Sequence, residues 1–147
     1  MDGATSRHLR IEADVERLAD VRALVREVAR ACHAPEVCIN DLVQAVDEAA
    51  TNVIARGYHG RPGWIEVTAR LVDGNIVVTL EDEAPTFDPT VVPAPDLSIS
   101  PQHRRPGGMG VHLIRLATDG FEHRPRHGGG NILTLTRSLD PRAKEDR

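Results

Sequence analysis

The sequence predicts a two-layer α+β fold, in which a mixed, mostly antiparallel sheet is covered by helices on one face. Residues 14–32 and 36–56 carry apolar side chains at spacings of three and four, the pattern of amphipathic helices. Residues 64–72 and 75–82 alternate apolar and polar side chains, which is typical of strands with one buried face. Asp73-Gly74 between them is a strong hairpin signal, so we expect these two strands to pair antiparallel.

A short strand and two helices are expected in the first part of the chain. His8–Ile11 alternates polar and apolar residues, and Asp14 is a candidate N-cap or first-turn acid for the first helix. Pro35 suits the first turn of the second helix, which we expect to end at Gly57 in a left-handed cap. The residues expected to face the core are Val15, Leu18, Val21, Val25, Val28 and Cys32 in the first helix, and Ile39, Val43, Val46, Ala50 and Val53 in the second, flanked by Leu42, Ala49 and Ile54.

A long loop is expected at residues 84–108, because its six prolines exclude a long helix or a central strand. Loops of this length in compact domains are typically lids, binding loops or disordered segments. A helix is expected from 107 to near 120, followed by a strand over 121–126, a turn at 128–130 and a last strand over 131–137. Residues 7–137 are therefore expected to form one domain, with flexible ends at 1–6 and 138–147.

Composition narrows the class of protein. A chain of 147 residues with 40% apolar and 27% charged residues fits one globular domain, and its net charge of −4 gives no broad attraction to nucleic acid or an anionic membrane. No apolar run approaches the ~20 residues that span a bilayer, and the first residues lack a secretory signal, so a cytoplasmic location is expected. Cys32 and Cys38 are expected to be reduced thiols. The seven histidines, with His103, His123 and His127 in loops, are expected to be solvated surface residues.

Three features indicate a functional site. The first is a Glu/Asn pair on a helix, and the second is an aspartate at the end of a strand. Glu48 and Asn52 lie one helical turn apart, so a carboxylate and a carboxamide share one face of the second helix. Such pairs are also common on solvated helices, but the carboxylate can orient a nucleophile and the amide oxygen can bind Mg²⁺. Asp82 has the phase of the core side at the end of its strand. A carboxylate there must have a partner or face a pocket, because burying it unpaired is costly.

The third feature is the glycine cluster at 107–110 (GGMG), which opens the last helix. Glycines at a helix start let the backbone approach a phosphate, and the exposed N–H groups favour an anion. The cluster equally suits a hinge at the end of a mobile loop, and it matches neither the Walker A nor the dinucleotide pattern. The coincidence of all three features favours a functional site.

Residues 45–54 (AVDEAATNVI), 82–84 (DEA) and 108–110 (GMG) resemble the N box and the two glycine boxes of the GHKL superfamily of ATPases and kinases. Within that superfamily the chain is most similar to the bacterial anti-sigma factor serine/threonine kinases of the RsbW and SpoIIAB type, also through 87–89 (FDP), 107–114 (GGMGVHLI) and 131–136 (NILTLT). The resemblance covers roughly residues 7–137 in the expected order, and it implies a Bergerat-type sandwich with an ATP lid.

The resemblance implies roles for the polar residues. Glu48 would be the general base or polarising carboxylate for the attacking hydroxyl, and Asn52 would be the Mg²⁺ ligand beside the ATP triphosphate. Asp82 would accept a hydrogen bond from the adenine amino group. Asn131, whose phase points inward, occupies the place where many superfamily members have a threonine that supports the adenine.

It also implies roles in the lid. Gly108 and Gly110 would let the lid backbone wrap the phosphates, and Arg104 or Arg105 would stabilise charge on the γ-phosphate, unless both are solvated. Ala84 departs from the pattern, because it replaces the glycine of the first glycine box. Its methyl group at the adenine pocket is either tolerated or weakens nucleotide binding.

The resemblance implies an ATP- and Mg²⁺-dependent serine/threonine kinase. Its substrate would be a STAS-domain anti-sigma antagonist and its other partner an RNA polymerase sigma factor, with a homodimer as the active form and no direct contact to nucleic acid or membrane. The Ala84 substitution motivates a second hypothesis, a non-catalytic nucleotide-binding or nucleotide-free module that sequesters a partner. The isolated catalytic half of a histidine kinase is a third, and the few residues before Arg7 offer no phosphoacceptor helix for it.

Overall fold

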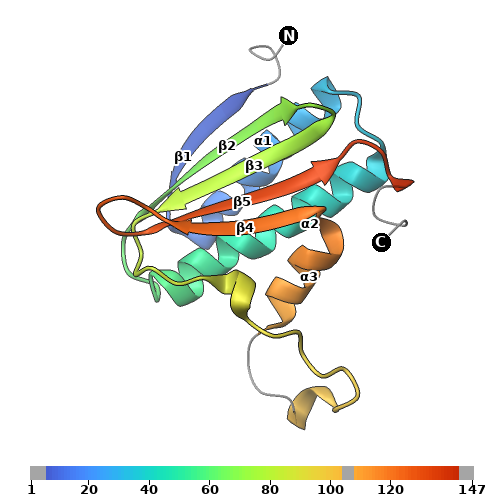
Figure 1. The fold of residues 1–147 in the computed structure, drawn as a ribbon. Coiled ribbons are helices and arrows are strands. Elements are labelled where there is room, and N and C mark those ends of the chain that lie inside the picture. Colours follow the sequence, from blue (N-terminus) through green and yellow to red (C-terminus); the bar gives the residue numbers. More distant parts are fainter. Residues whose placement is uncertain (1–5, 104–107, 143–147) are drawn as a thin grey trace.

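Five strands form one sheet with the order β1-β2-β3-β5-β4, and the helices cover one of its faces (Figure 1). The computed structural model describes residues 6–103 and 108–142. All four strand pairings are antiparallel, so the α+β class is confirmed, with no parallel pair among the described residues. The strands are β1 (Arg7–Glu12), β2 (Trp64–Val72), β3 (Asn75–Asp82), β4 (Gly120–Pro125) and β5 (Asn131–Ser138).

The first helix, α1 (Leu18–Ala31), begins later than the sequence predicts. Asp14 caps a preceding 3-10 turn, Val15–Arg17, by accepting a hydrogen bond from the Glu16 amide at 2.9 Å, so its role as an N-cap is confirmed. The expected burial of Val15 is wrong, because this side chain is 59% exposed. The helical phase that faces the core starts only at Leu18, after the tighter 3-10 turn.

The second helix, α2 (Glu36–Asn52), is buried on more than one side. Leu42 and Ala49, which were expected to flank the core face, are fully buried, because α2 packs against α1 and α3 as well as the sheet. The helix continues into a π-helical turn, Val53–Gly57. The left-handed cap expected at Gly57 is wrong, since the left-handed residues are His59 and Gly60, beyond that turn.

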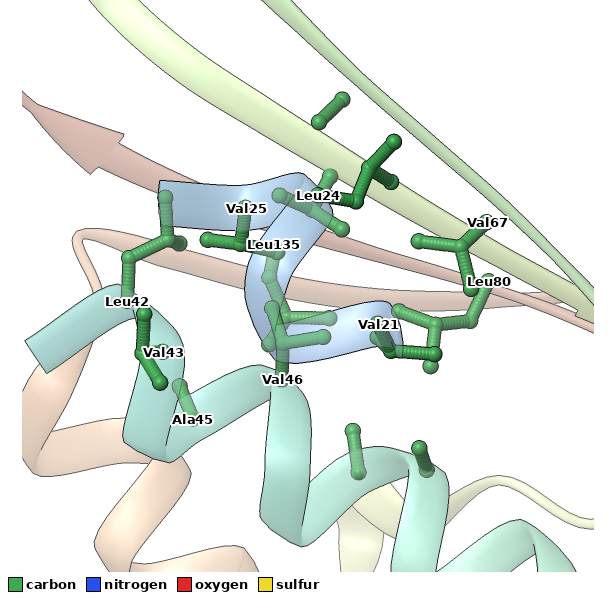
Figure 2. Close-up of a cluster of buried hydrophobic side chains, with 14 of the residues drawn as sticks. Val21, Leu24, Val25, Leu42, Val43, Ala45, Val46, Val67, Leu80 and Leu135 are labelled. Atoms are coloured by element: carbon green, nitrogen blue, oxygen red, sulfur yellow. The ribbon is translucent and has the colours of Figure 1, made fainter. Parts of the chain in front are cut away.

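The core lies between the two layers and is built almost entirely from aliphatic side chains. Figure 2 shows Val21, Leu24 and Val25 of α1 meeting Leu42 and Val46 of α2 beneath the sheet. Three strands contribute the opposite wall through the inward side chains Val67, Leu80 and Leu135. The alternation predicted for these strands is confirmed, and Asp73 and Gly74 both adopt positive φ in the hairpin turn.

Beyond β3 the described chain contains no long helix or strand until α3 (Met109–Ala117), as the prolines predict. Only two short 3-10 turns, Pro89–Val91 and Pro101–His103, occur in this segment, which extends away from the sheet (Figure 1). None of the helices in the described ranges is long and apolar enough to cross a membrane.

Candidate functional site

A cavity of about 570 Å³ lies between α2, α3, the adjoining ends of β3 and β5, and the start of the proline-rich segment. Small-molecule sites commonly have volumes of about 300–1,000 Å³. Six residues singled out by the motifs line this cavity, namely Asn52, Asp82, Ala84, Gly108, Gly110 and Asn131. Apolar side chains supply much of the remaining wall, including Ala49, Val53, Val92, Val111, Ile114, Phe121 and Leu133. Arg104 and Arg105 lie outside the described residues.

Asp82 brings a buried carboxylate to the cavity wall. Its Oδ1 accepts hydrogen bonds from the Ala84 amide at 2.9 Å and from Asn131 Nδ2 at 3.0 Å. Its Oδ2 is buried and has no hydrogen-bond partner among the described residues. Burial raises the pKa of Asp82, and the hydrogen bonds from Asn131 and Ala84 oppose that rise. An acceptor of this kind gains free energy when a ligand donates to it.

Asn131 lies directly opposite Asp82 in the β3–β5 register and is buried, as its predicted phase requires. Both ends of its side-chain amide bind protein groups. Nδ2 donates to Asp82 Oδ1, and Oδ1 accepts from the Phe87 amide at 2.9 Å and hydrogen-bonds His123 Nε2 at 2.7 Å. Asn131 therefore supports Asp82 and the first residues of the loop.

Asn52 lines the other end of the cavity, near the start of α3, whereas Glu48 is not among the lining residues and lies just beside them, next to Gly110. A methyl group placed on Gly110 would lie 3.0 Å from Glu48 Oε2 and 3.4 Å from Asn52 Nδ2. This close approach confirms that the two side chains share one helix face. A side chain at Gly110 would therefore require the Glu48 carboxylate to shift by a few tenths of an ångström.

The N-terminus of α3 opens onto the cavity. Gly108 precedes the helix with a φ of +83°, a left-handed conformation that glycine adopts without strain. Gly108, Gly110 and Val111 all line the cavity. The first N–H groups of a helix lack intrahelical partners and favour an anion. Together with the Glu48/Asn52 pair, this end can hold an anionic group and a hard cation.

Ala84 stands where the first glycine box carries glycine, and two observations explain why the methyl group fits. Its backbone does not have positive φ, so this position does not require glycine. Its buried Cβ faces Gly57, where an added methyl group would lie only 3.1 Å away. Gly57 thus leaves room for the side chain of Ala84.

The loop after Ala84 lies over the cavity and is held by one hydrogen bond within the loop and by others to α3 and to the residue before β5. Asp88 caps the 3-10 turn Pro89–Val91 by accepting from the Thr90 amide at 2.9 Å. Arg115 of α3 donates to the carbonyl oxygens of Thr90 and Val92, the latter at 2.8 Å. Thr86 donates its hydroxyl to the Gly130 carbonyl at 3.0 Å. The first part of the loop is therefore held against α3 and β5.

The expectation that His123 is a solvated loop residue is wrong. It lies in β4, and its side chain is 4% exposed. Its register partner, Leu133, is buried in the core, but β4 has only six residues, too few for its alternation to have identified this inward phase from the sequence. Arg56 is a second residue to which no role was assigned, and it lines the cavity one helical turn beyond Asn52.

The fold and the cavity are those of a two-layer α+β domain with a small-molecule site under a loop. The chain belongs to the histidine kinase-like ATPase domain family, whose model matches residues 11–137. Membership of this family implies ATP binding.

Relatives with assigned names support a narrower grouping within this family. A serine/threonine-protein kinase, BtrW of Bordetella bronchiseptica, is 31% identical over 68% of this chain and 70% of its own length. The serine-protein kinase RsbW of Bacillus cereus is 24% identical over 89% of this chain and 83% of its own. The anti-sigma F factor of Caldanaerobacter subterraneus is 26% identical over 69% of this chain and 71% of its own length.

A solved structure agrees with the fold. The crystal structure of the RsbU and RsbW domains of Rv1364c from Mycobacterium tuberculosis matches with a TM-score of 0.63 and 23% identity. The match covers 90% of this chain and 31% of that longer chain. The five-stranded antiparallel sheet with its helices is thus the fold of an RsbW-like domain.

Proposed function

We propose that this protein is an ATP-dependent serine/threonine kinase of the anti-sigma factor type. The observation that carries the proposal is the polarity of the cavity. One end includes Asp82, whose buried Oδ2 has no partner among the described residues. The other includes Asn52 and Gly110 at the start of α3, with Glu48 beside them. A nucleoside triphosphate has matching ends, a base with hydrogen-bond donors and an anionic chain. Apolar side chains between the ends suit the faces of a purine.

At the base end, Asp82 would recognise adenine. The exocyclic amino group of adenine donates hydrogen bonds, whereas the corresponding oxygen of guanine accepts them. A carboxylate with one free oxygen favours the donor and repels the acceptor. Asn131 and the Ala84 amide hold the other oxygen, so Oδ2 is the oxygen left for a ligand.

At the phosphate end, the N–H groups that begin α3 would bind the phosphate oxygens. No group of three or more histidine, cysteine, aspartate or glutamate side chains that could hold a metal occurs in the described parts of the chain. Mg²⁺ would accordingly be held by Asn52 and the phosphates themselves, and when bound it would neutralise developing charge on the transferred group.

Glu48 would act on the acceptor. Its half-exposed carboxylate lies beside Gly110, next to the proposed phosphate position. It can accept the proton of an attacking serine or threonine hydroxyl, or orient that hydroxyl for in-line attack. Arg105, or Arg104, would add positive charge at the γ-phosphate.

The names of the relatives support the partners of this kinase. We propose a STAS-domain anti-sigma antagonist as the phosphorylated substrate and an RNA polymerase sigma factor as the sequestered partner, because matched relatives are named RsbW and anti-sigma F factor. Such a switch would act in the cytoplasm as a homodimer. It would need no direct contact with nucleic acid or membrane.

Transfer of labelled phosphate from ATP to a cognate antagonist tests the proposal. We expect transfer by the wild type and a loss of about 100-fold or more in the Glu48→Gln variant, because general-base catalysis contributes roughly 10²–10⁴-fold. Glu16→Gln, an exposed residue of the 3-10 turn, serves as the matched control and should transfer normally. Undiminished transfer by Glu48→Gln would contradict the role assigned to that residue.

Ala84 favours one second candidate, a module that binds nucleotide and sequesters a partner without phosphorylating it. Calorimetry with ATP and Mg²⁺ beside the transfer assay separates the two. Binding without transfer supports the non-catalytic module, whereas binding with transfer supports the kinase. A titration without heat and without a thermal shift leaves only nucleotide-free sequestration.

A further inference from the structure

We propose that His123 is a positioning residue for base recognition, which orients the Asn131 amide so that Asp82 keeps one oxygen free for the ligand. The inference rests on the proposed ATP site. No motif of the sequence includes His123, and its side chain does not line the cavity. It would act only through Asn131.

The surroundings of the Asn131 amide determine its orientation. Nδ2 faces three acceptors, Asp82 Oδ1 at 3.0 Å, the Pro85 carbonyl at 3.2 Å and the Ala84 carbonyl at 3.4 Å. Oδ1 faces the Phe87 amide, which can only donate. A flipped amide would place an oxygen against the Asp82 carboxylate, so one orientation is strongly preferred.

This orientation determines the tautomer of His123. Because Asn131 Oδ1 can only accept, His123 Nε2 must carry a hydrogen and donate across the 2.7 Å contact. The other ring nitrogen, Nδ1, lies 3.9 Å from Asp88 Oδ1. The hydroxyl and amide of Thr90 hold Asp88 in place, so the imidazole lies between the Asn131 amide and an oriented carboxylate.

The contacts form a continuous path from the loop to the base site. Asp88 faces His123, His123 donates to Asn131, and Asn131 donates to Asp82. Without the imidazole donor, Asn131 Oδ1 would keep only the Phe87 amide, so the same orientation would be held less rigidly. The hydrogen bond from Asn131 Nδ2 to Asp82 Oδ1 would then weaken, and Oδ1 would compete with Oδ2 for the ligand. Removing the His123 imidazole should therefore affect recognition of the amino group of the base rather than binding of the phosphates.

A comparison of two nucleotides separates these effects. Calorimetry would measure the Kd of ATP and of purine riboside triphosphate, which lacks only the exocyclic amino group, for the wild type and for His123→Ala. We expect the wild type to prefer ATP by about tenfold or more, as for a hydrogen bond to a charged group. In His123→Ala the Kd of ATP should rise about 3- to 10-fold, while that of the analogue changes less than about twofold.

Two further variants test the role of the donor itself. His123→Gln places an amide N–H at a similar reach and should restore most of the preference for ATP. His127→Ala, an exposed histidine in the neighbouring turn, should leave both Kd values unchanged. If His123→Ala does not fold, His123→Phe fills the same space without a donor and should show the same selective loss.

The outcomes distinguish this inference from the proposed function. If the wild type binds neither nucleotide, the proposed ATP site is wrong, and the positioning role of His123 is then wrong as well. If the wild type prefers ATP and His123→Ala retains the full preference, or weakens both nucleotides equally, only the positioning role is overturned.

Discussion

The β3–β5 ladder buries one charged residue at each of its ends, and the two residues differ in how their charge is compensated. At one end Asp82 pairs in register with Asn131 and keeps an oxygen for which the described part of the chain offers no partner. At the other end Arg137 is 2% exposed, and its guanidinium contacts Asp41 Oδ2 at 3.0 Å and Asp119 Oδ2 at 3.3 Å. No cation lies within ion-pair distance of Asp82 among the described residues.

We interpret Arg137 as a structural charge and Asp82 as the charge that the proposed function uses. Burying an ion costs free energy unless opposite charges and hydrogen bonds surround it. The Arg137 cluster supplies two opposite charges within the chain, although Arg137 Nε has no hydrogen-bond partner among the described residues, and it ties β5 to α2 and to the residues before β4. Asp82 has no ion-pair partner among the described residues, which costs stability and fits the proposed role of this carboxylate as an acceptor for a ligand.

Removing the compensated charge should have the largest effect, and it should be on stability. Arg137→Ala leaves Asp41 and Asp119 facing each other without a cation, and we expect a loss of about 3–5 kcal/mol in the free energy of unfolding. Urea denaturation would measure this loss. Arg70→Ala, an exposed arginine on β2, is the matched control and should change stability by less than about 0.5 kcal/mol. Similar stabilities for the two variants would refute the structural role of the cluster.

Removing the charge of Asp82 should instead weaken ATP binding and raise the stability of the protein. In Asp82→Asn we expect the affinity for ATP to fall roughly 10- to 100-fold, because an acceptor bearing full charge is lost. The free energy of unfolding at neutral pH should rise by on the order of 1 kcal/mol, because a neutral amide is easier to bury. Calorimetry and thermal melting would measure the two effects. Asp73→Asn in the exposed hairpin is the control, and a less stable Asp82→Asn protein would contradict this contrast.

The smallest expected effect is a pH dependence that belongs to Asp82. Burial raises the pKa of Asp82 in the folded protein, so its contribution to stability is fully present below the unfolded pKa and is lost as pH rises through the folded pKa. Lowering the pH from above the folded pKa to below the unfolded pKa should therefore remove the free-energy cost of the buried Asp82 charge. It should also weaken ATP binding, because a protonated carboxyl group is a poorer acceptor.

Melting curves and calorimetry across that pH window would follow both changes. Asp82→Asn should lack this contribution to each profile, since it carries no titrating group at this position. A wild-type ATP affinity that rises on acidification would show that Asp82 does not accept a hydrogen bond from the base.

The sequence predicts the Asp82 end of the ladder well and the Arg137 end poorly. Alternation along β3 and β5 is regular, so the inward phases of Asp82 and Asn131 follow from period two alone. Arg137 has the same phase as Asn131, but its compensating aspartates lie 96 and 18 residues away in the chain. No local pattern relates such distant residues.

The remaining errors arise where short elements change the phase. The 3-10 turn before α1 turns Val15 outward, and the π-helical turn after α2 moves the left-handed residues beyond Gly57. His123 lies in a six-residue strand that ends at Pro125, too short for its alternation to be clear. Among the polar site residues, those on long regular elements could therefore be predicted, whereas His123 could not.

A crystal structure with Mg²⁺ and a non-hydrolysable ATP analogue tests the central claim most directly. It should show the adenine amino group donating to Asp82 Oδ2, the oxygen that has no partner within residues 6–103 and 108–142. The phosphates should lie against the start of α3, with Mg²⁺ on Asn52 Oδ1. A nucleotide bound outside this cavity, or bound inside it with Asp82 Oδ2 still unpaired, would contradict the account.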